Sequence, residues 1–368
     1  MKAKSRLPFL DRVFLWINCA LCFALLLSYL APVVDPRKFW IIAFFGLAYP
    51  MLLLANLILL VYWIFRGKAY LLIPLLTIAL GWRVLSNNIG FNTSDNDKPL
   101  GSGVRIMTYN VHNFKKYGSN NDIPTKHEIL QVINDQQPDI IGFQEFYTRR
   151  KGQFNMRDSI CGIMHTRYYC LDSMFYNQTE IIGMAIFSKL PIIDHGFIRL
   201  ADQGSSNQCV YVDVNKNGKL FRLYSVHLQS VGFDPEDYRY LNNVSEKGKP
   251  NLSSTKRLGS KLKSAFLKRS EQVEIIKRHA ATCPYPYIIS GDFNDTPASY
   301  AVNQMSKGLK NAFKEKGFGF VRTYNGAFPN FQIDYILSSP QFEIANYKVV
   351  EKKLSDHYPV RSDVKLRE

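Results

Sequence analysis

One short segment of the chain carries residue types suited to phosphate chemistry at close spacing. It is Gly291-Asp292-Phe293-Asn294, which follows the apolar run Tyr287-Ile288-Ile289 and is closed by Pro297. Carboxylate and amide oxygens bind hard cations such as Mg²⁺, and a carboxylate can also activate water. We therefore predict a buried strand that delivers Asp292 and Asn294 to its C-terminal edge.

Similar polar residues lie at other predicted strand ends, namely Asn110, Glu145, His227, Asp334 and Asp356-His357. Each has an ordinary structural explanation when it is taken alone. Asn110 would be a turn residue, Glu145 a solvated acid and His227 a hydrogen-bonded structural histidine. Because the pattern recurs in order along the chain, we interpret the set as a joint metal and phosphate site.

Hydrolysis of a phosphoester explains why these residue types occur together. A divalent cation neutralises the phosphate oxygens, a base activates or orients water, and cationic or hydrogen-donating groups stabilise the developing charge. Asp and Glu suit the cation, and His suits proton transfer near neutral pH.

The apolar periodicity predicts an α/β domain. Strand, helix and strand follow one another at 104–109, 125–136 and 139–143, which is typical of a crossover unit. Further strands are predicted at 181–187, 210–214, 220–226, 332–337 and 347–350, with a hairpin about Asn217-Gly218 and a last strand after Pro359. We expect a polar loop over 232–254 and a basic amphipathic helix over 256–281.

The order of these motifs resembles the endonuclease/exonuclease/phosphatase superfamily, which has the fold of pancreatic deoxyribonuclease and is represented here by a membrane-anchored bacterial type. The resemblance covers about residues 104–362. It rests on Thr108-Tyr109-Asn110, Gln144-Glu145, Ser225-Val226-His227-Leu228, Gly291-Asp292-Phe293-Asn294, Ile333-Asp334-Tyr335 and Ser355-Asp356-His357-Tyr358-Pro359-Val360. It implies a four-layer α/β sandwich of two packed mixed sheets flanked by helices.

The resemblance also implies a metal site and its ligands. Glu145 looks like the principal Mg²⁺ ligand, with Asn110 nearby, and Asp356 would serve a second ion or its water shell. Mn²⁺ is an alternative to Mg²⁺, and the sequence leaves one or two ions open.

The catalytic roles follow from the same resemblance. Asp292 would activate the attacking water and Asn294 would orient it. His357 would contact the scissile phosphate, held in orientation by Asp334, and His227 would be a second histidine facing the phosphate.

Two positions depart from the pattern of the superfamily. Asp295-Thr296 follows the Gly-Asp-x-Asn motif, where phosphoinositide phosphatases have Tyr-Arg, and this disfavours an inositol phosphatase. Gln332 precedes Ile-Asp-Tyr, where many members have Arg, so one phosphate-binding cation is missing or is supplied elsewhere.

Three apolar runs precede the predicted catalytic domain, and their lengths predict transmembrane spans at about 13–34, 39–65 and 69–85. Basic residues before the first run and between the second and third place the N-terminus in the cytoplasm. We therefore expect an integral protein of the bacterial inner or plasma membrane, with a transmembrane region at 1–85, a linker at 86–103 and an extracytoplasmic catalytic domain at 104–368. Buried helices of a soluble protein are the alternative.

The net charge is +16, and residues 247–278 hold ten Lys and Arg against Glu271 and Glu274. A solvated helix face explains this equally well as contact with nucleic acid or with anionic lipid. We assign Lys268 and Arg269 as candidate contacts to the substrate phosphate. Cys161 and Cys170 form either a disulfide or two buried thiols.

The sequence as a whole predicts a membrane-anchored, Mg²⁺-dependent phosphoester hydrolase that acts as a nuclease or phosphodiesterase. The substrate is nucleic acid or phospholipid, and no protein partner is predicted. The alternatives are a sphingomyelinase-like phospholipid phosphodiesterase and a non-catalytic domain that binds phosphate or nucleic acid. A transporter is disfavoured because the spans lack an intramembrane acid or Lys pair.

Overall fold

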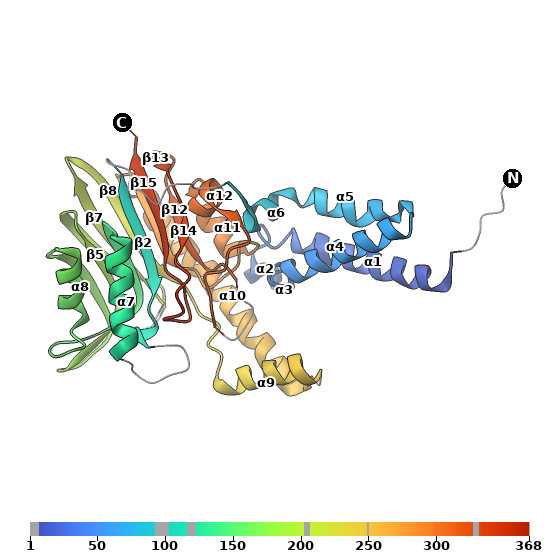
Figure 1. Ribbon diagram of the computed structural model, residues 1–368, viewed down its shortest axis with the longest axis horizontal. Helices are drawn as coiled ribbons and strands as arrows, with labels where there is room; N and C mark the ends of the chain where they lie inside the picture. Colours follow the sequence, from blue (N-terminus) through green and yellow to red (C-terminus); the bar gives the residue numbers. More distant parts are fainter. Residues whose placement is uncertain are drawn as a thin grey trace.

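The computed structural model describes residues 7–92, 103–115, 123–201, 207–248, 250–326 and 331–367. A group of N-terminal helices projects from one side of a layered α/β domain, and α1 begins at the far end of that projection (Figure 1). The two parts are in contact, because residues 36–47 of the N-terminal region pack against the helix at 252–281 of the α/β domain.

Seven helical segments make up the N-terminal region. They are α1 (Phe9–Ser28), α2 (Pro36–Phe39), α3 (Ile41–Leu47), α4 (Tyr49–Phe65), η1 (Ala69–Leu71), α5 (Leu72–Leu80) and α6 (Trp82–Asn88). Within the described residues, α1 alone is long and apolar enough to cross a membrane as one straight helix. The pairs Ile41–Leu47 with Tyr49–Phe65 and Ala69–Leu80 with Trp82–Asn88 also qualify if each is one span, but they are bent by 62° and 66°.

Each bend lies beside a residue that weakens a helix, Pro50 at the first and Gly81 at the second. Pro50 lies in the first turn of α4, where it removes one backbone N–H donor and disfavours helical geometry at the residue before it. Gly81 separates α5 from α6, and a Cβ at this position would collide with the ring of Tyr29. The second and third predicted spans are therefore broken helices, and the first begins at Phe9 and ends at Ser28 rather than covering 13–34.

The predicted linker at 86–103 begins with ordered structure. Helix α6 continues to Asn88, and β1 (Gly90–Phe91) pairs antiparallel with β11 (Phe318–Gly319) of the layered domain. Residues 93–102 lie outside the described part of the chain.

Two mixed sheets form the layered domain. One has six strands in the order β10-β12-β9-β8-β7-β6, and the other has seven, in the order β13-β15-β2-β3-β5-β4 with β14 beside β15. The strands of the first are β6 (Ile192–Arg199), β7 (Gln208–Lys216), β8 (Lys219–His227), β9 (Tyr287–Asp292), β10 (Lys310–Asn311) and β12 (Asp334–Ser338). Those of the second are β2 (Val104–Asn110), β3 (Ile140–Arg149), β4 (Tyr168–Tyr176), β5 (Glu180–Ser188), β13 (Phe342–Ile344), β14 (Lys348–Val349) and β15 (Val360–Leu366).

Three apolar cores join the sheets and helices into four layers. The core between the sheets includes Ile106, Ile186, Val212 and Ile288. Helices α7 (Ile123–Gln136) and α8 (Met156–Met164) cover the seven-stranded sheet, and α10 (Leu252–Ala281) and α11 (Tyr300–Ser306) cover the six-stranded one. The predicted mixed sheets with flanking helices are confirmed.

The predicted loop at 232–254 is wrong, because α9 (Pro235–Lys247) occupies most of it. Its N-terminus carries a capping box between Asp234 and Asp237, a signal that the apolar periodicity did not reveal. The structure also has helices η2 (His112–Phe114) and α12 (Ala312–Lys316).

Candidate active site

The ends of two parallel strand pairs bring the predicted site residues to one edge of the domain. β8 runs parallel to β9, and both strands end at this edge. β2 runs parallel to β3 and ends there at Asn110, whereas β3 continues past Glu145 to Arg149. β12 is antiparallel to β9, with Asp334 directly opposite Asp292 in the register. The first residue of β12 therefore lies beside the last residue of β9.

A β-bulge in β3 sets the direction of Glu145. The pairing of β3 with β5 shifts between Phe143 and Phe146, and Glu145 has a φ of 51°. Without the extra residue, Phe143 and Phe146 would point to opposite faces of the sheet. With it, both rings pack in the core under α7 and α8, while Gln144 donates to Ser225 of the other sheet. Glu145 is left half-buried at the edge.

Asn110 links the two sheets at this edge. Its amide nitrogen donates to Oε1 of Glu145 at 3.3 Å and to Oδ2 of Asp292 at 3.1 Å. The hydroxyl of Ser355 donates to the Asn110 carbonyl at 2.8 Å, which attaches the segment before β15 to the end of β2. The structure thus brings a ligand candidate and a base candidate from different sheets into contact with one amide.

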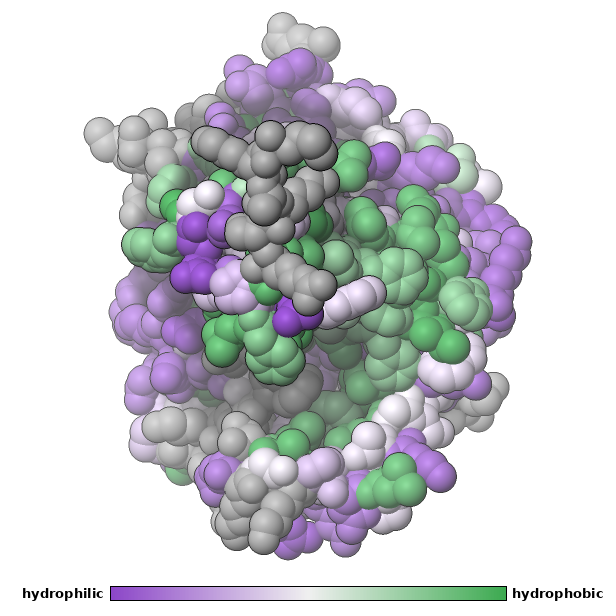
Figure 2. All heavy atoms as spheres, turned by 90° about the vertical axis from the view of Figure 1, so that its right-hand side faces the viewer, coloured by the Kyte–Doolittle hydropathy of each residue, from purple (hydrophilic) through white to green (hydrophobic). Residues whose placement is uncertain are grey.

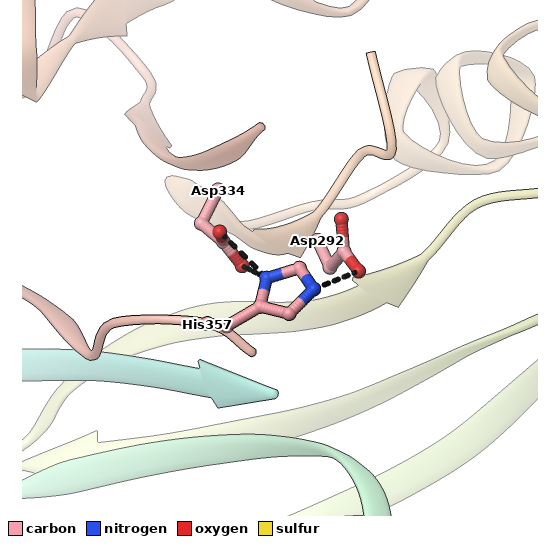
Figure 3. Close-up of side chains that lie close together, drawn as sticks. All are labelled: Asp292, Asp334 and His357. Atoms are coloured by element: carbon pink, nitrogen blue, oxygen red, sulfur yellow. Dashed lines mark hydrogen bonds and ion pairs between the residues drawn. The ribbon is translucent and has the colours of Figure 1, made fainter. Parts of the chain in front are cut away.

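Asp334, His357 and Asp292 form a buried row (Figure 3). Nδ1 of His357 lies 2.9 Å and 3.2 Å from the two oxygens of Asp334, and Nε2 lies 3.6 Å from Oδ2 of Asp292. The ring of Tyr324 meets that of His357 edge-on, with centroids 5.4 Å apart. Asp334 therefore holds Nδ1 of the imidazole, and Nε2 is turned toward Asp292.

Asn294 and His227 complete the surroundings of Asp292. The backbone N–H of Asn294 donates to Oδ1 of Asp292 at 2.8 Å, and its side-chain amide donates to Oδ2 at 3.1 Å. Nε2 of His227 lies 3.6 Å from Oδ2 of Asp292 and 3.8 Å from Oε1 of Glu145. All the residues predicted for the metal and the chemistry meet at this edge.

His112 joins the site, although the sequence did not single it out. Its Nδ1 lies 3.4 Å from Oε2 of Glu145 and 3.8 Å from Oδ1 of Asp356. His112, Asn113 and Phe114 all have positive φ, so the chain turns sharply after Val111. The available signal was the polar run Asn110-Val111-His112-Asn113, whose tight turn was not recognised.

The electrostatics of the acids differ sharply. Burial alone would raise the pKa of Glu145, but the His112 hydrogen bond and the charges of His227 and His357 outweigh it and lower this pKa to about 2. Burial raises the pKa of Asp292 to about 6, despite the opposing charge of His357. Burial would lower the pKa of His357, but Asp334 and Asp292 raise it well above its ordinary value. The site therefore holds one acid that is firmly ionised and another that titrates near neutrality.

The donor set fits a hard divalent cation. Glu145 offers an ionised carboxylate with 28% of its side chain exposed, and Asp356, with 15% exposed, approaches the same Nδ1 atom of His112. Asp292, Asp334 and His357 also have ligand atoms within 4.8 Å of one another. However, Nδ1 of His357 is already hydrogen-bonded to Asp334, so we do not assign these three residues as the metal ligands. Oxygen ligands beside Asn110 and Glu145 match the preference of Mg²⁺.

Arg269, a predicted substrate contact, lines the cavity at this edge and is paired with the loop after β9. It is buried, with Nε 3.0 Å from Asp295, and its Nη1 donates to the carbonyls of Asn294 and Gln229. Its charge is thus engaged in holding the loop after β9, because an unpaired guanidinium would be costly to bury. Lys268 is exposed.

Other basic residues of α10 pair with the unpredicted helix α9. Arg257 contacts Glu236 and Asp237, and Lys261 contacts Asp234 and Asp237. Three of the basic residues counted over 247–278, Arg257, Lys261 and Arg269, are therefore paired with acids. Cys161 and Cys170 are free thiols in the structure, not a disulfide.

Comparison with protein families agrees with this geometry. The model of the Endonuclease/Exonuclease/phosphatase family matches residues 107–357. The chain therefore belongs to the endonuclease/exonuclease/phosphatase family, and it is a phosphoester hydrolase. A second model, described as a domain of unknown function, matches residues 11–88. No curated protein matches the chain.

Solved structures with the same fold come from distant organisms. An endonuclease/exonuclease/phosphatase from Bacteroides vulgatus is 20% identical, with 72% of this chain and 99% of that one covered and a TM-score of 0.53. One from Beutenbergia cavernae is 18% identical, with 72% of each chain covered and a TM-score of 0.52. The human Nocturnin catalytic domain with bound sulfate is 16% identical, with 73% and 96% covered and a TM-score of 0.50. At these identities the likeness shows the fold alone.

Proposed function

We propose that the protein is a membrane-anchored hydrolase that cleaves phosphoesters, as a nuclease or phosphodiesterase, with Mg²⁺ bound at Glu145 and Asn110. The observation that carries the proposal is the convergence of Glu145, Asp292 and His357 at one edge, with Asn110 bonded to both acids. Mg²⁺ would neutralise phosphate oxygens there, with Asp356 serving a second ion or its water shell, and Mn²⁺ could replace it.

The protein's own residues would carry the proton and orient the substrate. Asp292 accepts a proton from water, and its raised pKa of about 6 suits a base that works near neutral pH. Asn294 holds the Asp292 carboxylate through two hydrogen bonds. The resulting hydroxide attacks phosphorus, and the bond between phosphorus and the leaving oxygen breaks. The electron pair departs with that oxygen, which takes a proton from water.

The histidines would stabilise the charge that develops on the phosphate. The raised pKa of His357 keeps its imidazole protonated, so that Nε2 can donate to a phosphate oxygen. Asp334 holds Nδ1 and leaves Nε2 facing the site. His227 lies on the other side of Asp292 and offers a second donor to the same phosphate.

The N-terminal region would anchor the domain in a membrane by three spans, two of them broken. Figure 2 looks at the molecule from the end that carries this region and shows hydrophobic side chains gathered there, with hydrophilic ones around them. Trp16, Phe23, Leu54, Ile58 and Leu76 are among the exposed apolar residues of α1, α4 and α5. Surfaces of this kind are stable in lipid and costly in water.

The basic residues support the proposed orientation. Arg66 lies after α4, where it pairs with Asp11 of α1 at 2.9 Å. In Figure 1 this end of the helices lies away from the α/β domain. A cytoplasmic location for that end places the catalytic domain outside the cytoplasm.

The test uses the full chain in lipid nanodiscs with bis(para-nitrophenyl) phosphate and plasmid DNA as substrates. We expect turnover that a chelator abolishes and that Mg²⁺ or Mn²⁺ restores. Asp292→Asn should remove most of this activity, whereas Asp194→Asn, a change to an exposed carboxylate of β6, should leave it unaltered. Turnover that persists in chelator, or that survives Asp292→Asn, would contradict the proposal.

A further inference from the structure

The cavity at the catalytic edge is lined by polar groups and by a set of apolar residues. Its volume is about 250 Å³. The polar lining residues include Glu145, His227, Arg269, Asp356 and His357. The apolar lining residues include Leu47, Val231, Phe233, Leu262 and Phe266, and we call this set the apolar side. A phosphoester with a second, apolar portion would match both sets.

The N-terminal helices supply part of the apolar side. Leu47 is the last residue of α3, outside the part of the chain that matches the enzyme family. One turn earlier, the ring of Phe44 packs edge-on against Phe266 of α10, with centroids 5.3 Å apart. Gly46 lies so close to the Ala298 carbonyl that an added Cβ would be 3.0 Å from its oxygen. The cavity is therefore completed by the proposed membrane region.

The same contacts place the cavity at the boundary of the proposed bilayer. Phe39, Trp40 and Ile41 begin this segment and are exposed. Lys263 of α10 lies over the Trp40 ring, 4.6 Å from its centroid. Tryptophan next to a lysine is typical of the level of lipid headgroups. A lipid entering at this level would carry its phosphate toward the catalytic edge and its chain along Leu47 and Phe266.

The charges near the cavity favour a lipid over a nucleic acid. Nucleic-acid binding relies on Lys and Arg that neutralise successive phosphates. On α10, however, Arg257 and Lys261 are paired with acids of α9, and Arg269 is buried against Asp295. A single phosphate on an apolar chain requires fewer cations and uses the apolar side.

We propose that the substrate is a membrane-resident phosphoester with an apolar chain, and that Leu47 of the N-terminal region is a specificity-determining residue. This inference rests on the proposed function. The N-terminal helices then have two uses: they hold the enzyme at the bilayer, and they form the side of the cavity that receives the chain.

The test measures kcat/KM of the full chain in nanodiscs for two esters that release para-nitrophenol. They are para-nitrophenyl methyl phosphate and para-nitrophenyl octyl phosphate. Each fully buried methylene can contribute up to about fourfold in kcat/KM. We expect the octyl ester to be preferred by at least about tenfold, and Leu47→Ala to reduce the octyl-to-methyl ratio about fivefold. Leu54→Ala is the matched control, because Leu54 lies on α4 with 59% exposed and does not line the cavity.

Partition of the octyl ester into the nanodisc is the same for all three proteins, so the change in ratio between them reports the cavity. A ratio that Leu47→Ala leaves unchanged, or that Leu54→Ala lowers equally, overturns the inference. Faster cleavage of plasmid DNA than of the octyl ester, at equal phosphodiester concentration, also overturns it in favour of nucleic acid. Each of these results overturns only the inference about the substrate and leaves the proposed function in place. Absence of chelator-sensitive turnover on every substrate contradicts the proposed function itself.

Discussion

Replacement of Asp334 by Asn removes one charge from the buried row at the catalytic edge with almost no change of shape. Asp334 and His357 are 1% and 4% exposed, and both carboxylate oxygens lie within 3.2 Å of Nδ1. An asparagine could offer its oxygen or its amide nitrogen to Nδ1, and only the oxygen would preserve the present tautomer. The substitution therefore weakens control of both the charge and the orientation of His357.

The expected loss follows from the role of the pair. A positioned acid–base group contributes about 10²–10⁴-fold to the rate. We expect kcat/KM to fall within this range, which corresponds to about 3–5 kcal/mol of transition-state stabilisation. Because Asp334 raises the pKa of His357, its loss lowers that pKa, and the protonated imidazole disappears at lower pH. The alkaline limb of the pH profile should therefore move to lower pH.

The assay is hydrolysis of bis(para-nitrophenyl) phosphate with Mg²⁺, followed across the pH range from weak acid to weak base. Asp213→Asn is the matched control. Asp213 is equally buried and pairs with Arg222 at 2.5 Å, on β7 and away from the catalytic cavity. This control should lower thermal stability and leave the pH profile in place.

Three results would refute the reasoning. They are an unchanged kcat/KM in Asp334→Asn, an alkaline limb that stays where it is, and an equal shift in Asp213→Asn. The first would show that His357 needs no partner, and the others would show that its charge does not come from Asp334.

Three further predictions follow from the structure. Arg269→Ala should lower the free energy of unfolding by about 3–5 kcal/mol, because it leaves Asp295 unpaired. Thermal unfolding followed by circular dichroism should show little change for the control, Lys268→Ala. Equal melting temperatures of the two variants would contradict the buried pair. Because the pKa of Asp292 is raised to about 6, the stability from its protonated form is present below about pH 4 and lost as the pH rises through 6. Mg²⁺ should therefore raise the melting temperature more at neutral than at acidic pH, and equal shifts would argue against binding beside this acid. Alkaline phosphatase should be active when fused to the C-terminus and inactive when fused after Lys68, and the reverse result would invert the proposed topology.

Much of the catalytic edge could be predicted from local sequence. Each strand that carries a site residue has an apolar run next to a short polar motif, as at Ile289 and Asp292. The Asn217-Gly218 hairpin was equally readable, since both residues have positive φ in a two-residue turn. Apolar periodicity and turn residues are properties of neighbouring positions in the chain. They can therefore be recognised without information about distant contacts.

Interactions between distant segments decided the rest. Arg269 looked like a free cation on a basic helix, but its partner Asp295 lies in the loop after another strand. The bulge at Glu145 depends on how β3 pairs with β5, and no local signal marks it. Helix α9 lies where the sequence indicated a polar loop, and acids in and just before it pair with basic residues of α10.

The residue types and their order along the chain were sufficient to predict a metal-dependent phosphoester hydrolase, because Asp, Glu, Asn and His at strand ends have few other combined uses. Only the tertiary structure decided that Leu47, from the first part of the chain, lines the same cavity as His357 near its end. The physical reason is that apolar contacts carry no directional signature in sequence. Which surface a half-buried leucine covers depends on the packing of the two regions, and here that packing forms one side of the candidate active site.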